Sequence, residues 1–343
     1  MNITPDRFDA LVARYPSLRL ALVGDLCLDR YLEIDPLRRE TSLETGLPVH
    51  NVVQVRAQPG AAGTILNNLV ALGLGEMYPV SFCGVDGEGF ELRRALEAKT
   101  GVRLEHFIST DQRRTFTYCK PLLLVAGQPP TELNRLDSKN WTPTPPALEQ
   151  RLVASLERLA PQVDAVIVMD QVDVAETGVV TSHVLAALGQ LAATQPSLLI
   201  LADSRRGLRG FPRLTFKMNA AELATLTGRP VQENLAEIGQ TAVALARAQG
   251  QRVFVTLAER GVLGASPQGE VEHVPALPVR GEIDIVGAGD SVTANLASAL
   301  AAGATLREAL ELASVAASLV IHQLGTTGTA SVPQIRDLLF GGG

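Results

Sequence analysis

Asp284-Ile-Val-Gly-Ala-Gly-Asp290 is the stretch on which the interpretation of this chain depends, and a predicted helix follows directly, at 291–296. A helix that begins straight after glycines leaves its first backbone N–H groups without partners inside the helix. Those donors, together with the positive end of the helix dipole, can bind an anion such as a phosphoryl group in transfer. Asp290 is then either a helix cap or a catalytic carboxylate, and spacing alone does not separate the two.

Outward from this stretch, short apolar runs alternate with segments that carry apolar residues at spacings of three and four. The runs are typical of buried strands and the segments of amphipathic helices. Such alternation predicts an α/β fold in which helices cover both faces of a mostly parallel sheet. We expect strands at 18–23, 80–83, 165–169, 198–202 and 253–257, and helices at 147–159, 181–193 and 235–248.

Two stretches, 31–58 and 113–136, interrupt this alternation. Both are rich in Thr, Val, Arg and Pro and show partial period-two patterning. This pattern predicts a small antiparallel β lid that projects from the main body, with irregular surface loops as the alternative. We expect residues 1–343 to form one domain into which the two lid segments are inserted.

Composition excludes several classes of protein. The 343 residues are 46% hydrophobic and carry a formal net charge of −6, so we expect neither nucleic acid nor an anionic membrane as a partner. The three cysteines, Cys27, Cys83 and Cys119, are too few and too widely spaced to indicate a disulfide framework or a zinc site, which favours a cytoplasmic location. Residues 1–16 mix charges with apolar residues, unlike a signal peptide, and no run approaches the ~20 apolar residues of a membrane span.

Other polar residues stand next to apolar runs. Asn219 and Glu222 are one helical turn apart and could order magnesium-bound water around phosphates, or could simply form a capping box. Asp25 and Asp29 follow the first apolar run, where two acids could bind sugar hydroxyls or cap a turn. The segment 253–261 is a buried strand followed by a turn.

Taken in chain order, these segments resemble the ribokinase-like carbohydrate kinases, also called the phosphofructokinase-B family, over nearly the whole chain. The signature of that family near its C-terminus is Asp-x-x-Gly-Ala-Gly-Asp. The resemblance implies ATP-dependent phosphorylation of a sugar or sugar-phosphate hydroxyl. Asp290 would accept the hydroxyl proton, while Gly287, Ala288 and Gly289 would form an anion hole. Asp284 matches the residue beside the monovalent-cation site of the family.

The resemblance also implies a nucleotide side that takes ATP and Mg²⁺, with K⁺ as a further candidate at Asp284. Glu222 would act on Mg²⁺ through water. Ala258 is a departure, because it stands where the family usually has glycine. The implied nucleotide-binding residues are Asn219, Glu222, Thr256, Glu259, Gly261 and, in a closing loop at 324–328, Gly325.

On the acceptor side, segment 22–31 is similar to the opening of bacterial heptose 7-phosphate kinases. Ala61 replaces a usual glycine, Thr64 replaces a substrate-binding asparagine, and Gln171 follows Asp170 where those kinases have tyrosine. Arg205 and Arg206 could face an acceptor phosphate or be a solvated pair. The implied substrate-binding residues are Asp25, Asp29, Gly60, Ala61, Thr64 and Asp170.

These departures leave the acceptor open. The alternatives are a kinase for another alcohol, such as a nucleoside or a different sugar, or a catalytically silent module that senses sugar or nucleotide. Lid strands of this family often pair, so the resemblance implies a homodimer through the lid. Heptose kinases are often fused to a nucleotidyltransferase, whereas we expect this chain to act as a separate kinase.

Overall fold

The main body is a nine-stranded sheet in a computed structural model that describes residues 1–325 and 327–341. Its strands run in the order β15-β14-β13-β12-β11-β10-β1-β6-β7. Pairing is parallel from β13 to β7 and antiparallel at β14 and β15. The strands are β1 (Arg19–Gly24), β6 (Glu76–Gly84), β7 (Phe107–Thr110), β10 (Ala165–Asp170), β11 (Leu199–Ser204), β12 (Thr215–Asn219), β13 (Val253–Thr256), β14 (Val262–Ala265) and β15 (Val271–Val274).

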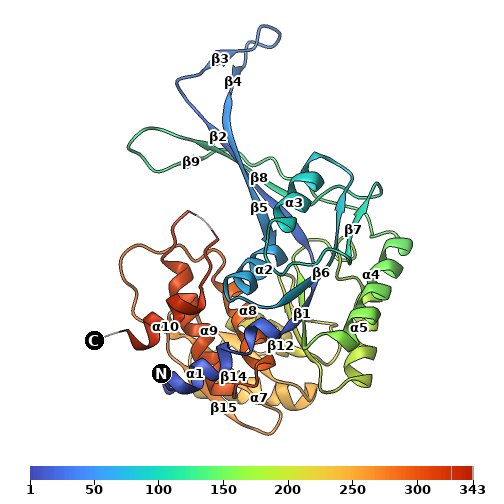
Figure 1. The fold of residues 1–343 in the computed structure, drawn as a ribbon, viewed down its shortest axis with the longest axis vertical. Coiled ribbons are helices and arrows are strands. Elements are labelled where there is room, and N and C mark those ends of the chain that lie inside the picture. The colour runs from blue at the N-terminus through green and yellow to red at the C-terminus, as the bar shows by residue number, and fades with distance from the viewer. Residues whose placement is uncertain (326, 342–343) are drawn as a thin grey trace.

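Helices cover both faces of this sheet, and each face has its own apolar core (Figure 1). Leu69 and Leu296 lie in one core, and Leu152 and Leu188 lie in the other. The predicted α/β fold is therefore confirmed. One face carries α1 (Pro5–Val12), α2 (Ala62–Ala71), α3 (Gly87–Glu97), α8 (Ala288–Ala301), α9 (Leu306–Ile321) and α10 (Val332–Phe340), and the other carries α4 (Pro146–Leu159), α5 (Ser182–Thr194), α6 (Ala220–Thr227) and α7 (Leu235–Gln249).

A second sheet, in the order β5-β2-β8-β9, projects from the main body as a long arm (Figure 1). The predicted lid sheet is therefore confirmed, with two differences. Its first strand begins at Leu26 rather than at residue 31, because the base of that strand is buried and lacks the alternation of a lid. The pairing of β2 with β8 is parallel. The strands are β2 (Leu26–Ile34), β5 (Val52–Ala61), β8 (Thr117–Leu123) and β9 (Thr131–Glu132), and β3 (Glu40–Thr41) pairs with β4 (Pro48–Val49) near the tip.

Polar residues gather at the carboxyl edge of the main sheet. Asp25 follows β1, Asp170 ends β10, Asp203 stands next to the last residue of β11, and Asn219 ends β12. Because these strands are parallel, their carboxyl ends meet at one edge, where ligands bind in open α/β sheets. The lid rises from the same edge, since β2 begins one residue after Asp25.

None of the helices in residues 1–325 and 327–341 combines the length and the apolar character needed to cross a membrane.

Candidate active site

The glycine turn before α8 creates an anion-binding geometry. Gly287 has φ of 85°, in the left-handed region that favours glycine, and caps α8 without a side-chain hydrogen bond. Ala288, Gly289 and Asp290 form the first helical turn. The Ala288 N–H donates to the Ile285 carbonyl at 3.2 Å, whereas the N–H groups of Gly289 and Asp290 have no acceptors inside the helix. Asp290 is partly exposed at this turn, whereas every residue from 291 to 299 is buried. The sequence thus places one carboxylate at the open end of a core helix.

A buried ion pair lies directly beneath this turn. The Lys217 ammonium donates to Oδ2 of Asp203 at 2.7 Å, and the Thr293 hydroxyl donates to the same oxygen at 3.1 Å. A Cβ atom added to Gly289 would lie 3.2 Å from Lys217 Nζ, so the ammonium packs against the glycine turn. Lys217 and Asp203 are both buried. The turn therefore has a fixed positive charge next to its open N–H groups.

Sequence reasoning missed Lys217, although a signal was present. It stands inside the short strand β12, between the buried residues Phe216 and Met218. A lysine in an apolar run is almost never fully buried unless it is paired. Lys217 therefore should have indicated a buried acidic partner near Asn219.

The electrostatic environment makes Asp290 a base that titrates near neutral pH. Burial raises the pKa of Asp290 to about 7, and the carboxylates of Asp203 and Asp29 add to the shift while Lys217 opposes it. General bases work best when their pKa lies near the working pH. The influence of Asp29 on Asp290 also shows that the lid and the glycine turn face the same space.

Asp29 reaches this space from the base of the lid. Its carboxylate lies against Gly60 on β5, where an added Cβ would be only 2.5 to 2.8 Å from the carboxylate atoms. Gly60 is therefore required by close approach. Burial raises the pKa of Asp29, and Lys120 and Arg135 oppose that shift. Two carboxylates, one from the lid and one from α8, thus lie on the same side of the sheet edge.

Both carboxylate oxygens of Asp25 accept hydrogen bonds from backbone N–H groups. Its Oδ2 accepts from the backbone N–H groups of Gln171 and Val172 at 2.9 and 3.3 Å, and its Oδ1 accepts from Val179 N–H at 2.7 Å. The carboxylate is 4% exposed. Asp25 therefore holds the loop after β10, as the capping alternative predicts.

Asp170 is also bound to neighbouring protein groups. Its Oδ2 accepts from the Ser204 hydroxyl at 2.7 Å and from Arg206 at 2.8 Å, and the residue is fully buried. Burial and the neighbouring Asp25 raise the pKa of Asp170 to about 6. Arg206 is therefore paired inside the site edge, and Arg205 pairs with Asp173 at 3.4 Å. Both arginines are thus exposed residues that each form an ion pair.

The two alanines that replace family glycines keep a glycine-like backbone. Ala61 has φ of 55° and ψ of −121°, and Ala258 has φ of 52°. Residues with a Cβ atom rarely adopt such conformations, which cost on the order of 1–3 kcal/mol. Ala61 joins lid strand β5 to α2. Both alanines thus adopt a positive φ that is usual for glycine.

Thr64 connects α2 to the glycine turn. It is 2% exposed, and its methyl carbon lies 3.5 Å from where a Cβ on Gly287 would stand. The methyl group therefore packs against the backbone that would hold an anion. An asparagine amide at this position would offer a hydrogen bond there instead.

The predicted nucleotide residues lie at neighbouring strand ends. Asn219 and Thr256 are directly paired in the β12–β13 register. Asn219 and Glu222 form a full capping box, since Glu222 N–H donates to Asn219 Oδ1 at 2.9 Å and Asn219 N–H donates to Glu222 Oε2 at 2.7 Å. Capping therefore occurs, and Glu222 remains partly exposed. Burial raises its pKa, and nearby Asp203 adds to the shift.

The remaining predicted residues lie in turns. Glu259 is exposed after β13, and Gly261, with φ of 94°, passes so close to the Val274 carbonyl that a Cβ would clash there. Gly325 has φ of 71°. Asp284 accepts from Val286 N–H at 3.0 Å, and its own N–H donates to the Ile321 carbonyl at 2.8 Å. Thr326 of the predicted closing loop lies outside the described residues.

The oxygen groups around Glu222 fit a magnesium ion that is bound mainly by water and phosphates. Glu222 and Asp203 are near enough for the Asp203 charge to raise the pKa of Glu222. In the described ranges, 1–325 and 327–341, no three His, Cys, Asp or Glu residues come together as a metal cluster. Magnesium commonly keeps several waters and is held by one or two carboxylates plus substrate phosphates, so it needs no such cluster.

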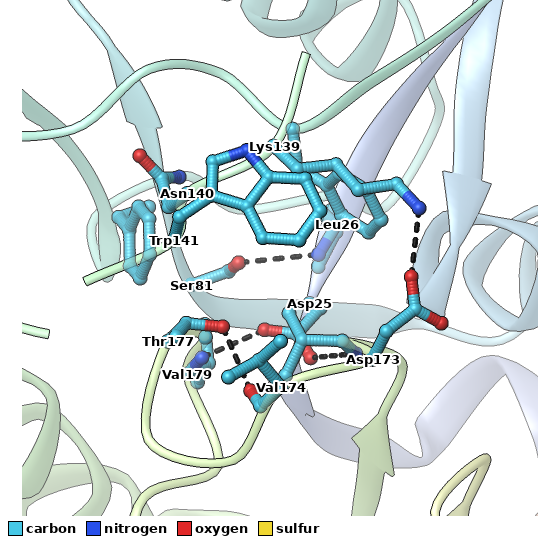
Figure 2. Close-up of a pocket in the computed structure, with 14 residues that line it drawn as sticks. Asp25, Leu26, Ser81, Lys139, Asn140, Trp141, Asp173, Val174, Thr177 and Val179 are labelled. Carbon is cyan, nitrogen blue, oxygen red and sulfur yellow. Dashed lines mark hydrogen bonds and ion pairs between the residues drawn. The ribbon is translucent and has the colours of Figure 1, made fainter. Parts of the chain in front are cut away.

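A small pocket lies behind Asp25 (Figure 2). Trp141 and Lys139 lie on one side of it and face Asp25 and Val174, and Lys139 pairs with Asp173 at 2.7 Å. Asp290 and Asp29 are not among its lining residues. We therefore regard this pocket as separate from the space between the lid and α8.

Comparison with known proteins gives consistent results. The family model "pfkB family carbohydrate kinase" matches residues 20–333. Among curated relatives, "Bifunctional protein HldE" of Bradyrhizobium sp. (strain ORS 278) is 31% identical over 97% of this chain and 66% of its own length. The protein of the same name from Rhodospirillum rubrum is 32% identical over 94% and 62%. The chain thus spans somewhat less than two thirds of these relatives.

Solved structures with a similar fold are more distant in sequence. Arabidopsis thaliana ribokinase, complexed with ribose and ATP, has a TM-score of 0.65 at 20% identity, covering 94% of this chain and 99% of its own. Escherichia coli phosphofructokinase-2, in complex with fructose-6-phosphate, has a TM-score of 0.67 at 17% identity, covering 94% and 97%. At these identities the likeness concerns the fold.

Proposed function

Because this chain belongs to the pfkB family of carbohydrate kinases, we propose that it transfers the γ-phosphoryl group of ATP to a hydroxyl of a sugar phosphate, with Asp290 as general base. The observation that carries this proposal is the position of Asp290, at the open end of α8 with a pKa of about 7. A carboxylate that served only as a helix cap would need no such pKa. Residues 1–343 act as one kinase domain in this proposal.

The chemistry follows from groups already described. Asp290 accepts the proton of the acceptor hydroxyl, the oxygen bonds to the γ-phosphorus, and the bond to the ADP oxygen breaks. Such transition states are loose, so catalysis depends on positioning and on neutralising the equatorial oxygens. In this proposal the N–H groups of Gly289 and Asp290 and the Lys217 ammonium neutralise that charge. Magnesium, held near Glu222 through water, would neutralise phosphate charge.

A phosphorylated acceptor is favoured by cationic side chains on the lid. Arg135, just after β9, lies 4.5 Å from the centre of the Tyr118 ring and pairs with Asp137 at 2.9 Å. Lys120 lies 5.0 Å from the Tyr31 ring and acts on the charge of Asp29. Cations on the acceptor side can bind a phosphate that is not transferred. With the resemblance of segment 22–31, this supports a heptose 7-phosphate as acceptor.

A different acceptor remains the second candidate, and one observation favours it. Thr64 presents a methyl group where the heptose kinases carry a substrate-binding amide. A site built without that amide would select a sugar with a different pattern of hydroxyl groups. We also propose a cytoplasmic homodimer that pairs through the lid, with K⁺ at Asp284. Exposed Leu37, Leu43 and Leu47 near the lid tip support the pairing.

The test is a coupled assay of ADP release. The acceptors are D-glycero-β-D-manno-heptose 7-phosphate, the same heptose without phosphate, fructose 6-phosphate, ribose and adenosine, each with K⁺ or Na⁺. We expect the highest kcat/KM for a phosphorylated sugar, and a turnover number lower by about 10³-fold or more for Asp290→Asn. Calorimetric binding of a sugar without turnover across the panel would contradict the kinase proposal and favour a sensing module.

A further inference from the structure

Gln58 forms a contact between the lid and the rest of the site that the catalytic roles above do not use. Its side-chain amide donates to the Thr327 hydroxyl at 2.9 Å, across 269 residues of sequence. Gln58 belongs to β5 and stands directly opposite Asp29 in the β2–β5 register. Thr327 belongs to the loop between α9 and α10. The bond therefore joins the strand that supports the lid carboxylate to a loop of the main body.

Thr327 itself lies next to the glycine turn. Its Cβ and Cα atoms lie 3.5 and 3.6 Å from where a Cβ on Gly287 would stand. A displacement of Thr327 toward the turn would therefore bring it closer to the backbone at Gly287. Since Gly287 N-caps α8, the position of Thr327 bears on the N–H groups of the anion hole.

The loop that carries Thr327 is otherwise fixed to the main body. The Gln323 side chain accepts from Thr329 N–H at 3.1 Å and donates to the Thr329 carbonyl at 2.7 Å. The Asn68 amide on α2 donates to the Gly328 carbonyl at 3.5 Å. The bond from Gln58 is thus made to a loop whose next two residues, Gly328 and Thr329, are bonded to the main body.

We propose that Gln58 is a positioning residue that couples the lid to the glycine turn through Thr327. This inference rests on the proposed kinase function and deepens it. When a nucleotide fixes the turn and the neighbouring loop, the hydrogen bond holds β5, and with it Asp29, in the position required for the acceptor. When the bond is removed, the nucleotide still binds but no longer orders the lid. The linkage is reciprocal, so a bound acceptor favours nucleotide binding.

The test uses the full-length protein and Mg²⁺ with a non-hydrolysable ATP analogue, AMP-PNP, as the probe. Calorimetry gives its affinity, and hydrogen–deuterium exchange of β5 amides gives the lid response. In the unmodified protein we expect AMP-PNP to slow exchange of these amides about tenfold. In Gln58→Ala and Thr327→Val we expect that protection to be lost while the AMP-PNP affinity changes less than about threefold.

Matched variants separate this coupling from a general loss of structure. Gln54→Ala removes the same amide from an exposed position on the same strand and should keep the protection. Thr327→Ser keeps the hydroxyl and should also keep it. The double variant Gln58→Ala/Thr327→Val should behave like either single variant, because both remove one bond.

The kinase function and the coupling through Gln58 are contradicted by different results. If AMP-PNP does not bind the unmodified protein, the kinase function falls and the coupling falls with it. If it binds but β5 exchange is unchanged, or if Thr327→Val keeps the full protection, Gln58 does not couple the lid to the turn and the kinase proposal stands.

Discussion

At the start of α8 the backbone supplies the binding groups and the key carboxylate stays partly accessible, whereas at the base of the lid several carboxylates are bound to neighbouring protein groups. Asp290 stands beside open N–H groups and a buried ammonium. Asp25 and Asp170 instead hold backbone amides, a serine and an arginine. Only Asp29, of the three acids predicted on the acceptor side, acts on the charge of Asp290.

This difference explains why the reaction can be inferred more easily than the acceptor. Phosphoryl transfer needs an anion hole and a base, and a short glycine-rich segment specifies both. The residues predicted on the acceptor side come from the lid, α2 and the ends of β1 and β10, which come together only in the folded chain. Similar sequences on this side can therefore recognise different sugars.

The largest expected effect comes from removing the base on the donor side. Asp290→Asn should lower kcat by about 10³-fold or more, because general base catalysis typically contributes 10²–10⁴-fold. Nucleotide affinity, measured by calorimetry, should remain within a few-fold, since the helix start is kept. A near-normal kcat for this variant would show that Asp290 is not the base, and the start of α8 would then not differ from the base of the lid in this respect.

The same substitution should affect stability in a pH-dependent way. The pKa of Asp290 is raised in the folded state from 3.8 to about 7, so its ionised form destabilises the fold above pH 7 and has no such effect below pH 4. Asp290→Asn should therefore raise the melting temperature at pH 8 and leave it nearly unchanged at pH 4. An equal rise at both pH values would indicate a packing effect instead.

The next largest effect should come from the ammonium beneath the turn. Lys217→Met leaves Asp203 buried without its partner, so the free energy of unfolding should fall by about 3–5 kcal/mol in urea titration. The pKa of Asp290, read from the pH dependence of the remaining activity, should move above 7 because Lys217 opposes its rise. The control is the double variant Lys217→Met/Asp203→Asn. It should recover part of the stability that Lys217→Met loses, but it should not recover kinase activity, because the ammonium is still absent.

A comparison of two aspartates sharpens the contrast within the acceptor side. Asp29→Asn should raise the acceptor KM by about 10-fold to 100-fold with little change in melting temperature, as expected when one charged hydrogen bond to a ligand is lost. Asp25→Asn should destabilise the fold by about 1–3 kcal/mol, because its new NH2 group replaces an acceptor oxygen and faces one or two of the three backbone donors. Steady-state kinetics gives the acceptor KM of both variants, and thermal unfolding gives their stability. The reverse pattern would show that Asp25 contacts the acceptor.

The smallest expected effect concerns backbone strain. Ala61→Gly should stabilise the fold by about 1 kcal/mol, since relief of the left-handed strain exceeds the entropy cost of glycine. Ala258→Gly should act in the same direction. Ala62→Gly, one residue further on inside α2, is the control and should destabilise by up to about 1 kcal/mol. Equal losses in all three variants, measured by urea unfolding, would mean that the alanines are unstrained.

Much of the fold was predictable from the sequence because strand and helix periodicities are local. The predicted helix at 147–159 matches α4 within one residue, and the segment at 235–248 matches α7 equally well. The strand β12 was not predicted, because its five residues include a buried lysine that breaks the apolar run. The base of β2 was missed because that part of the strand is buried and does not alternate.

For the site, the sequence identified residues but not what each one contacts. Asp25, Asp29 and Asp170 all follow or end apolar strands, and only the three-dimensional neighbours distinguish them. Asp25 meets a loop almost 150 residues away, and Lys217 meets Thr293 through their shared partner Asp203. No local pattern encodes such contacts. The glycine turn was predictable because its geometry is set within seven residues.

The central claim is that Asp290 is the base of a phosphoryl-transfer site, and the pH dependence of kcat/KM tests it most directly. For the unmodified protein with its best acceptor, kcat/KM should rise with pH on a single acid limb centred near pH 7, as the pKa of about 7 requires. The residual activity of Asp290→Asn should lack that limb. A limb centred near pH 4, or the same limb in Asp290→Asn, would contradict the account.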